Sequence, residues 1–194
     1  MENTDLRVIK SRKNIRLAFI ELMKEKTYQA ITVKDISEKA MINRKTFYFH
    51  YETKEDLYNE IANDVAKLIE PKKLLNEIQS SNIENQRKIM LHFVSGLKKH
   101  KEICTIFLDD VSNPKFSNML KDQLTDALTL KIENYKSTKG SDFTFDFLLD
   151  AYYSIFKVVL KWWLASPCED PNVPIEYFFR LFSKEPLDLL GIKY

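Results

Sequence analysis

Residues 32–54 read TVKDISEKAMINRKTFYFHYETK, and this stretch predicts two short helices, a tight turn between them and the start of a third helix. Thr32 and Asp35 are spaced as a capping box at the start of the first helix, and the same pattern recurs at 53–56 before the third helix. Asn43 is a good N-cap for the second helix. The order of these signals is typical of a helix-turn-helix.

The second short helix has an apolar inner face and an outer face of unusual composition. Phe47 and Tyr51 are four residues apart, so they share the inward face. The outward positions carry two cations and two aromatics, which are Arg44, Lys45, Tyr48 and Phe49. Such side chains suit the major groove of DNA, where cations donate to guanine edges and aromatics meet thymine methyl groups. The alternatives are that the two aromatics belong to the core and that the cations form a solvated helix start.

The stretch from about Lys13 to Leu68 resembles the DNA-binding domain of the TetR family of bacterial regulators. The segments IRLAFIELMKEKTYQAITVKDISEKA and INRKTFYFHYETKEDLY carry the resemblance, and the second is similar to the family's T-Y-H-F-x-x-K-x-x-L run. The resemblance implies that the DNA contacts are made by Thr32, Arg44, Lys45, Thr46, Tyr48, Phe49, His50 and Lys54. A buried structural role is the alternative for His50. Lys54 lies in the first turn of a helix, where a DNA phosphate would explain a cation that opposes the helix dipole.

The sequence departs from this family at two glycine positions. Met41 stands in the turn and Thr27 stands before Tyr28, where the family usually has glycine. A non-glycine residue at a positive φ costs on the order of 1 kcal/mol. This leaves open the shape of the turn and the angle of the second helix.

Composition is ordinary for a globular protein of 194 residues, with 44% hydrophobic and 30% charged residues and a net charge of +2. Five cations and no acid lie between Arg7 and Arg16, either as an arm along phosphates or as a frayed, solvated terminus. The N-terminus lacks an apolar signal region, and charges interrupt the most apolar stretch, residues 143–165. With only two cysteines, no disulfide framework is expected. We therefore expect a cytoplasmic protein without a membrane span.

Long periodic segments and only three glycines predict an all-α protein. Its parts are an N-terminal three-helix helix-turn-helix domain (1–53), a linking helix (54–70) and a C-terminal helical bundle that dimerises and binds a ligand (71–194). Residues 1–8 are expected to be disordered, followed by a helix from about Ile9 to Lys26. The linking helix carries its inward residues at helical spacing and ends before Pro71. These residues are Leu57, Tyr58, Ile61, Val65 and Leu68.

The C-terminal region keeps the helical period. Helices are expected near 74–78 and over Asn82–Lys99, Glu102–Asp109, Phe116–Tyr135, Phe143–Ala165 and Ile175–Ser183, with the three prolines Pro167, Pro171 and Pro174 around a loop. The helix over 143–165 is apolar on almost every side, so it needs a second cover. We expect residues 143–183 to pair with the same residues of a second copy in a two-fold homodimer. The alternative is that these are the central helices of a monomeric bundle.

Aromatic residues are dense in the C-terminal region. The family resemblance implies a pocket there for a small-molecule effector, with an aromatic lining that suits apolar or planar ligands. The candidates are Phe93, Phe107, Phe116, Tyr152, Phe156 and Trp162, and for each of them plain core packing is the alternative. His100 and Cys104 have metal-ligand spacing, but no third ligand at a compatible spacing accompanies them. No metal and no cofactor are expected.

Signatures of the common enzyme classes are missing from the sequence, including a phosphate-binding glycine loop and the G-x-S-x-G, H-E-x-x-H and C-x-x-C motifs. We therefore expect a regulator and not an enzyme. The resemblance implies a ligand-responsive repressor that binds a near-palindromic DNA operator as a dimer. The alternative is a ligand-dependent co-regulator that binds a partner protein and not DNA, which the altered turn at Met41 leaves open.

Overall fold

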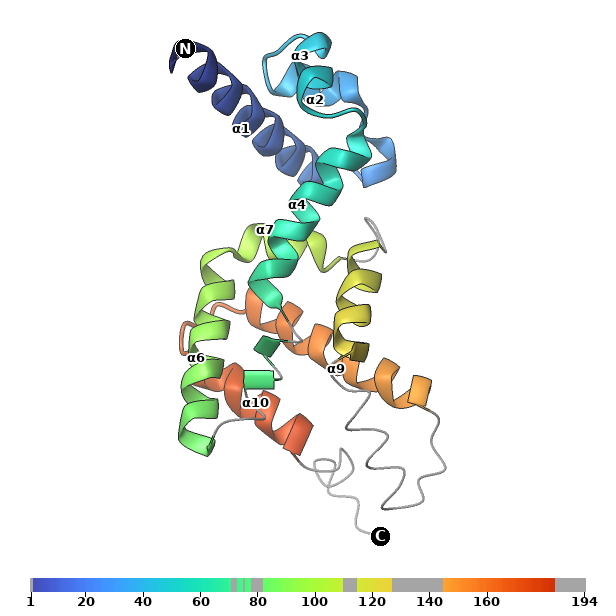
Figure 1. Ribbon diagram of the computed structural model, residues 1–194. Coiled ribbons are helices and arrows are strands. Elements are labelled where there is room, and N and C mark those ends of the chain that lie inside the picture. The colour runs from blue at the N-terminus through green and yellow to red at the C-terminus, as the bar shows by residue number, and fades with distance from the viewer. Residues whose placement is uncertain are drawn as a thin grey trace.

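A computed structural model describes residues 2–70, 73–74, 76–77, 82–109, 115–126 and 145–183. Within these ranges every regular element is a helix, so the all-α prediction is confirmed. Figure 1 shows the helices in two groups, with one long helix running from the first group into the second. None of the helices in the described ranges is long and apolar enough to cross a membrane.

The first group contains the helix-turn-helix. Its elements are α1 (Glu2–Glu25), a single 3₁₀ turn (Tyr28–Ala30), α2 (Val33–Lys39) and α3 (Arg44–His50), and α4 (Lys54–Ile69) follows. Helix α1 packs against both α2 and α3. The inward residues expected on α1 are all buried, and they are Ile15, Ala18, Phe19, Leu22 and Met23.

Two expectations about these helices are wrong. Helix α1 begins at Glu2, so residues 2–8 are helical and not disordered. The first 25 residues contain neither glycine nor proline, so nothing in them breaks the helix. On α4, Leu68 is 36% exposed whereas Ile69 is fully buried. The buried residues Ala62 and Ala66 extend the inner face of α4 toward position 69, which lies seven and three residues beyond them.

The second group contains the C-terminal helices. They are α6 (Ile83–Lys99), α7 (Lys101–Phe107), a helix over 115–126, α9 (Phe145–Ala165) and α10 (Asn172–Ser183). Asn82 caps α6 by accepting a hydrogen bond from the backbone N–H of Asn85. Pro174 lies in the first turn of α10 and not in the preceding loop, because a proline at a helix start removes no intrahelical hydrogen bond. The expected helical residues Leu75 and Ile78 and the range 127–144 lie outside the described residues.

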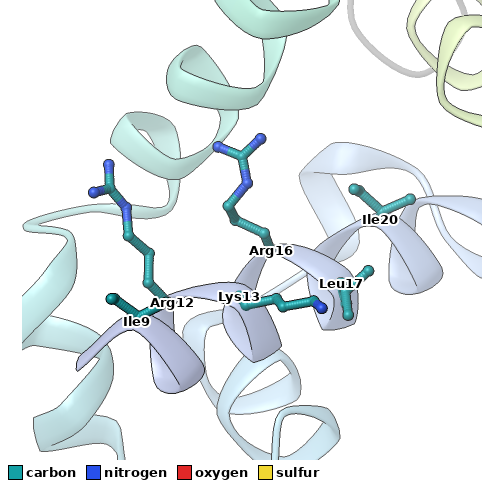
Figure 2. Close-up of a pocket in the computed structure, with 6 residues that line it drawn as sticks. All are labelled: Ile9, Arg12, Lys13, Arg16, Leu17 and Ile20. Atoms are coloured by element: carbon teal, nitrogen blue, oxygen red, sulfur yellow. The ribbon is translucent and has the colours of Figure 1, made fainter. Parts of the chain in front are cut away.

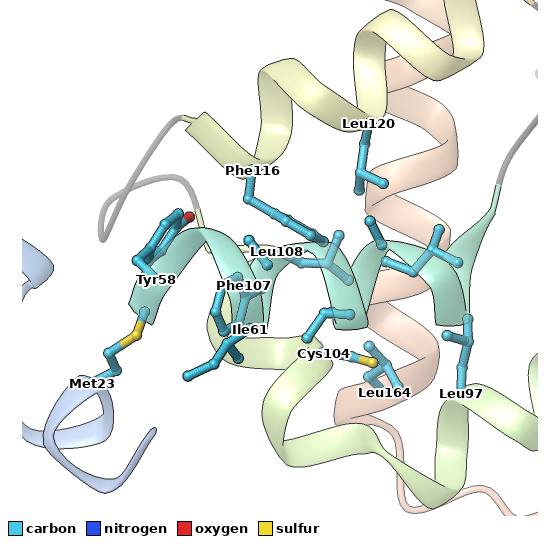
Figure 3. Close-up of a cluster of buried hydrophobic side chains, with 14 of the residues drawn as sticks. Met23, Tyr58, Ile61, Leu97, Cys104, Phe107, Leu108, Phe116, Leu120 and Leu164 are labelled. Carbon is cyan, nitrogen blue, oxygen red and sulfur yellow. The ribbon is translucent and has the colours of Figure 1, made fainter. Parts of the chain in front are cut away.

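Helix α4 joins the two groups through an aromatic column. The ring of Tyr58 on α4 stacks on Phe107 of α7 at 5.2 Å between centroids, and Phe107 meets Phe116 edge-on at 5.3 Å. On its other side, Tyr58 contacts Tyr28 at 5.0 Å. Figure 3 shows Tyr58, Phe107 and Phe116 within one buried cluster that continues to Leu120. The column therefore extends without a break from the helix-turn-helix into the C-terminal core.

The adjacent residues Leu68 and Ile69 test this packing. Ile69→Ala should lower the free energy of unfolding by about 2–5 kcal/mol, because it leaves a cavity in the core. Leu68→Ala removes a partly exposed side chain and should cost less than about 1 kcal/mol. Urea unfolding followed by circular dichroism measures both values. Equal losses for the two variants would contradict the orientation of α4.

Candidate nucleic-acid interface

The start of α2 is fixed by a complete capping box. The hydroxyl of Thr32 accepts a hydrogen bond from the backbone N–H of Asp35 at 3.1 Å, and the Asp35 carboxylate accepts one from the Thr32 N–H at 2.8 Å. Hydrogen bonds from Thr32, with a smaller contribution from Lys26, lower the pKa of Asp35 to about 2. The carboxylate is therefore ionised at neutral pH, and the predicted cap is confirmed.

The turn between α2 and α3 has the geometry that glycine would adopt. Met41 has φ of 55°, which places it in the left-handed region. Its N–H donates to Glu38, and the N–H of Ile42 donates to Ser37, at 3.1 and 3.0 Å. The Met41 side chain is 93% exposed. The departure from glycine thus leaves the turn tight and adds an apolar side chain beside α3.

Helix α3 presents the predicted outer face. Asn43 caps it by accepting a hydrogen bond from the N–H of Lys45 at 2.9 Å. Phe47 is buried in the core, whereas Tyr48 and Phe49 are 55% and 71% exposed. Arg44 and Lys45 are also exposed. The core alternative for Tyr48 and Phe49 is therefore wrong, and the helix brings two cations and two aromatic rings onto one accessible surface.

His50 lies at the end of α3 and contacts α1. Its Nε2 is 2.6 Å from the hydroxyl oxygen of Ser11, and the side chain is half-buried. Burial lowers the pKa of His50, and the charge of Arg12 lowers it further, while Glu60 acts in the opposite direction. This contact supports a structural role for His50 in joining α3 to α1. Its predicted DNA contact stays a prediction.

Lys54 has partners within the chain. Its ammonium donates to the carbonyl oxygens of Tyr28 and Ile31 at 2.7 and 2.6 Å and lies 4.2 Å from the centre of the Tyr28 ring. Burial lowers the pKa of this amine. An outside anion is therefore not needed to explain its position, and its predicted DNA contact stays a prediction. Lys54 holds the segment that leads into Thr32 and so positions the start of α2.

A network around Glu60 fixes α1 on α4, and the sequence reading missed it. Arg12 binds the Glu60 carboxylate at 2.5 Å, Arg16 binds both Glu60 and Asp64, and the Tyr51 hydroxyl donates to Glu60 at 3.1 Å. Burial opposes ionisation of Glu60, but the hydrogen bonds from Arg12 and Arg16 lower its pKa overall. The only feature of the sequence that could have indicated this network is the run of cations without acidic residues on α1. The acidic partners of these cations lie more than 40 residues away in the sequence.

The predicted DNA contacts therefore divide into two groups. Five of them are exposed on the helix-turn-helix and are accessible to a large partner, and these are Thr32, Arg44, Lys45, Tyr48 and Phe49. Thr46, His50 and Lys54 are half-buried. Met41 extends the exposed set, although no sequence signal beyond the altered turn indicated it.

The predicted ligand residues whose side chains the structure describes differ in burial. Phe107, Phe116 and Phe156 are buried in the core, and Phe93 is half-buried. Trp162 lies on the surface, where it meets Tyr177 of α10 edge-on at 5.1 Å. The side chain of Tyr152 lies outside the described residues. In the described ranges no group of three or more His, Cys, Asp or Glu residues could hold a metal ion. Burial raises the pKa of the Cys104 thiol to about 11.

Two family models match the chain. The model described as bacterial regulatory proteins of the tetR family matches residues 16–61. The model described as a transcriptional regulator C-terminal region matches residues 84–184, which is more than half of the chain. The first match contains α2 and α3 with its exposed face, and the second extends from the first turn of α6 to the end of α10.

Two curated proteins are similar over part of their length. The uncharacterized HTH-type transcriptional regulator YxbF of Bacillus subtilis is 32% identical over 95 residues, which is 48% of this chain and 25% of YxbF. The activator DhaS of the dhaKLM operon of Lactococcus lactis is 42% identical over 60 residues, which is 30% of this chain and 32% of DhaS. The matched segments therefore span about a quarter to a third of these relatives.

Solved structures are similar over nearly the whole chain. A TetR transcriptional regulator from Streptococcus agalactiae superposes with a TM-score of 0.63 and 26% identity, over 93% of this chain and 97% of that one. NalD, the secondary repressor of the MexAB-OprM multidrug efflux pump in Pseudomonas aeruginosa, gives a TM-score of 0.60 and 22% identity over 93% and 95%. At this identity the likeness to NalD shows the fold alone.

The burial of His50 makes stability depend on pH. Because burial lowers the pKa of His50 below its ordinary 6.5, the unfolded chain binds a proton more readily than the folded chain. The contribution of neutral His50 to the free energy of unfolding is present above pH 6.5. It is lost as the pH falls through the lowered pKa. Between about pH 7.5 and pH 5, the melting temperature of the parent chain should fall further than that of His50→Gln, by on the order of 1–3 °C.

Scanning calorimetry at the two pH values measures this difference. Ser11→Ala is the matched control, because it removes the hydrogen bond and leaves the imidazole in place. An identical pH dependence in the parent chain and His50→Gln would show that His50 does not contribute.

Proposed function

The chain belongs to the TetR family of bacterial regulatory proteins, and from this premise we propose that it is a transcriptional regulator that binds duplex DNA as a homodimer. The proposal depends on one observation above all, the exposed surface of α3. Arg44 and Lys45 lie there beside two exposed aromatic rings, on a helix whose start is capped and whose inner face is buried. The short α3 is then the recognition helix of the helix-turn-helix.

Each side chain on α3 has a distinct proposed role. Arg44 and Lys45 lie in the first turn, which is the end of a recognition helix that approaches base edges, and they donate to guanine. Tyr48 and Phe49 follow on the same surface and contact thymine methyl groups or sugars. Thr32 and Thr46 offer hydroxyl groups to phosphate oxygens. Met41 projects beside this surface and adds an apolar contact to the backbone sugars.

We propose that the dimer forms through α9 and α10. Tyr153, Phe156, Val159 and Trp163 of α9 face the core, while Val158 is 63% exposed and Trp162 packs on Tyr177 at the surface. An exposed apolar surface across two adjacent helices is typical of a protein interface. The same surface on a second copy would cover it in an isologous contact. A two-fold axis there presents two copies of α3 to successive major grooves of a near-palindromic operator.

The proposed effector binds within the C-terminal helices and acts through the aromatic column. Phe93 and the apolar residues around Phe107 and Phe156 remain the candidate walls of its site. A displacement of α7 would move Tyr58, because the Tyr58 ring stacks on Phe107 of α7. Tyr58 in turn contacts Tyr28, which lies under the Lys54 ammonium. A coupling of about 1–3 kcal/mol between effector and DNA suffices for release of the operator.

We propose repression as the sense of regulation, because a dimer that covers an operator needs no further contact to block transcription. The similar proteins include both directions of regulation, since NalD is described as a repressor and DhaS as an activator. A reporter gene behind the operator distinguishes them in cells. Lower expression with the regulator than without it supports repression, and higher expression excludes it.

Fluorescence anisotropy with duplex DNA from upstream of the chain's own gene tests DNA binding. We expect tight binding with a steep salt dependence, a strong preference over random DNA and two chains per duplex by sedimentation. Arg44→Ala should weaken operator binding by about 1–3 kcal/mol and relax specificity at one base pair. Lys99→Ala, which removes an exposed cation on α6, is the control. An operator affinity that Arg44→Ala leaves unchanged would exclude α3 as the recognition helix.

Lys54 distinguishes positioning from phosphate binding. Lys54→Met keeps the aliphatic stem and removes the two hydrogen bonds to Tyr28 and Ile31. We expect weaker binding to all DNA sequences with an unchanged slope of log affinity against log salt. A direct phosphate contact would instead reduce the slope by about one unit. Full affinity with an unchanged slope would contradict both roles.

A further inference from the structure

Helix α1 carries two rows of apolar side chains on nearly opposite faces. The inner row packs in the core, whereas Leu6, Ile9 and Leu17 of the outer row are 58%, 58% and 52% exposed. Ile20 continues this outer row and is partly buried. A surface helix ordinarily has a polar outer face. Exposed aliphatic side chains in this position, interrupted only by Lys13, are typical of an interaction surface.

The outer row borders an open groove of about 480 Å³. Its lining residues are Ile9, Arg12, Lys13, Arg16, Leu17 and Ile20 (Figure 2). In Figure 2 the side chains of Arg12 and Arg16 extend away from the helix on one side, where they bind carboxylates of α4. Lys13 runs along α1 toward Leu17. The open hollow therefore combines three aliphatic and three cationic side chains, all from α1. An amphipathic helix with acidic residues beside its apolar face complements such a lining.

The charges on this face favour an acidic occupant. No Asp or Glu occurs between Arg7 and Ile20. Arg12 and Arg16 have partners on α4, but Lys10 and Lys13 form no ion pair in the part of the chain that the structure describes. A second copy of the same face would bring lysines against lysines. Duplex DNA offers no aliphatic surface of this length, and a flat lipid bilayer does not fill a groove.

We propose that the outer face of α1, formed by Leu6, Ile9, Lys10, Lys13, Leu17 and Ile20, is the docking site for an acidic amphipathic helix of a partner protein. The apolar side of that helix packs against Ile9, Leu17 and Ile20, and its carboxylates bind Lys10 and Lys13. The inner row of α1 packs toward α2 and α3, so the docking face points away from the recognition helix. The partner and DNA can therefore be bound at the same time.

Two labelled helical peptides of about 20 residues test the site on the full-length chain. Both carry leucine at three- and four-residue spacing, and the remaining positions are Glu and Ala in one and Lys and Ala in the other. Fluorescence anisotropy should show saturable binding of the acidic peptide, about tenfold tighter than the basic peptide. Leu17→Ser and Lys13→Glu should each weaken binding about fivefold or more.

Matched controls come from other exposed positions. Leu68→Ser removes a partly exposed leucine of α4, and Lys99→Glu reverses an exposed cation of α6, and neither should change peptide binding. Melting temperatures check that each variant is folded, and Ile9→Ser replaces Leu17→Ser if the latter unfolds. Operator affinity should be the same in Leu17→Ser as in the parent chain, so this test is independent of DNA recognition.

Three outcomes would overturn the proposal. The first is no saturable binding of the acidic peptide at millimolar concentration. The second is binding that Leu17→Ser and Lys13→Glu leave unchanged. The third is that the parent chain binds phosphatidylglycerol vesicles, that Leu17→Ser and Lys13→Glu abolish this binding, and that the acidic peptide does not bind. That result would assign the face to a lipid surface.

Discussion

The stack of Tyr58 on Phe107 is the contact on which the arrangement of the two halves depends. It places the side of α4 against α7, while the first turn of the same helix holds the segment before α2 through Lys54. A helix of 16 residues is about 24 Å long and behaves as one rigid rod. In the proposed mechanism, this helix carries a shift of α7 to the helix-turn-helix. The ion pair between Lys24 and Glu102, at 3.1 Å, adds a second link between α1 and α7.

The orientation of α3 depends on polar contacts as much as on its buried ring. Glu60 binds two arginines of α1 and the hydroxyl of Tyr51, the residue that ends α3. His50 binds Ser11 one residue earlier. Because these contacts approach α3 from two helices, its outer face cannot rotate without breaking several of them. The network also occupies two of the cations of α1 and leaves Lys10 and Lys13 for other partners.

Three exposed surfaces of different chemistry follow from this arrangement. The surface of α3 combines cations with aromatic rings, which suits the edges of bases. The outer face of α1 combines aliphatic side chains with lysines, which suits an acidic helix. The surface of α9 and α10 is apolar and aromatic, which suits an identical copy of itself. In the functions proposed here, the three surfaces would serve DNA, a partner helix and a second copy of the chain.

The sequence by itself determined the local structure, because caps and helical periods act over three or four residues. The two capping boxes, the Asn43 cap, the inward Phe47 and the outward Tyr48 and Phe49 were all predicted correctly for this reason. The sequence also showed that Met41 stands where the family usually has glycine, but only the structure gave the left-handed backbone of this turn.

Only the tertiary structure decided which long side chains meet across the chain. Lys54 reaches carbonyl groups 23 and 26 residues away, and Arg12 reaches a carboxylate 48 residues away. No periodicity in the sequence encodes such partners. The sequence alone therefore suggested DNA phosphates as partners for cations that bind other groups within the folded chain. The choice of Ile69 over Leu68 likewise depends on which helices approach each other. Local preference specifies an element and its face, while the packing of elements specifies what that face touches.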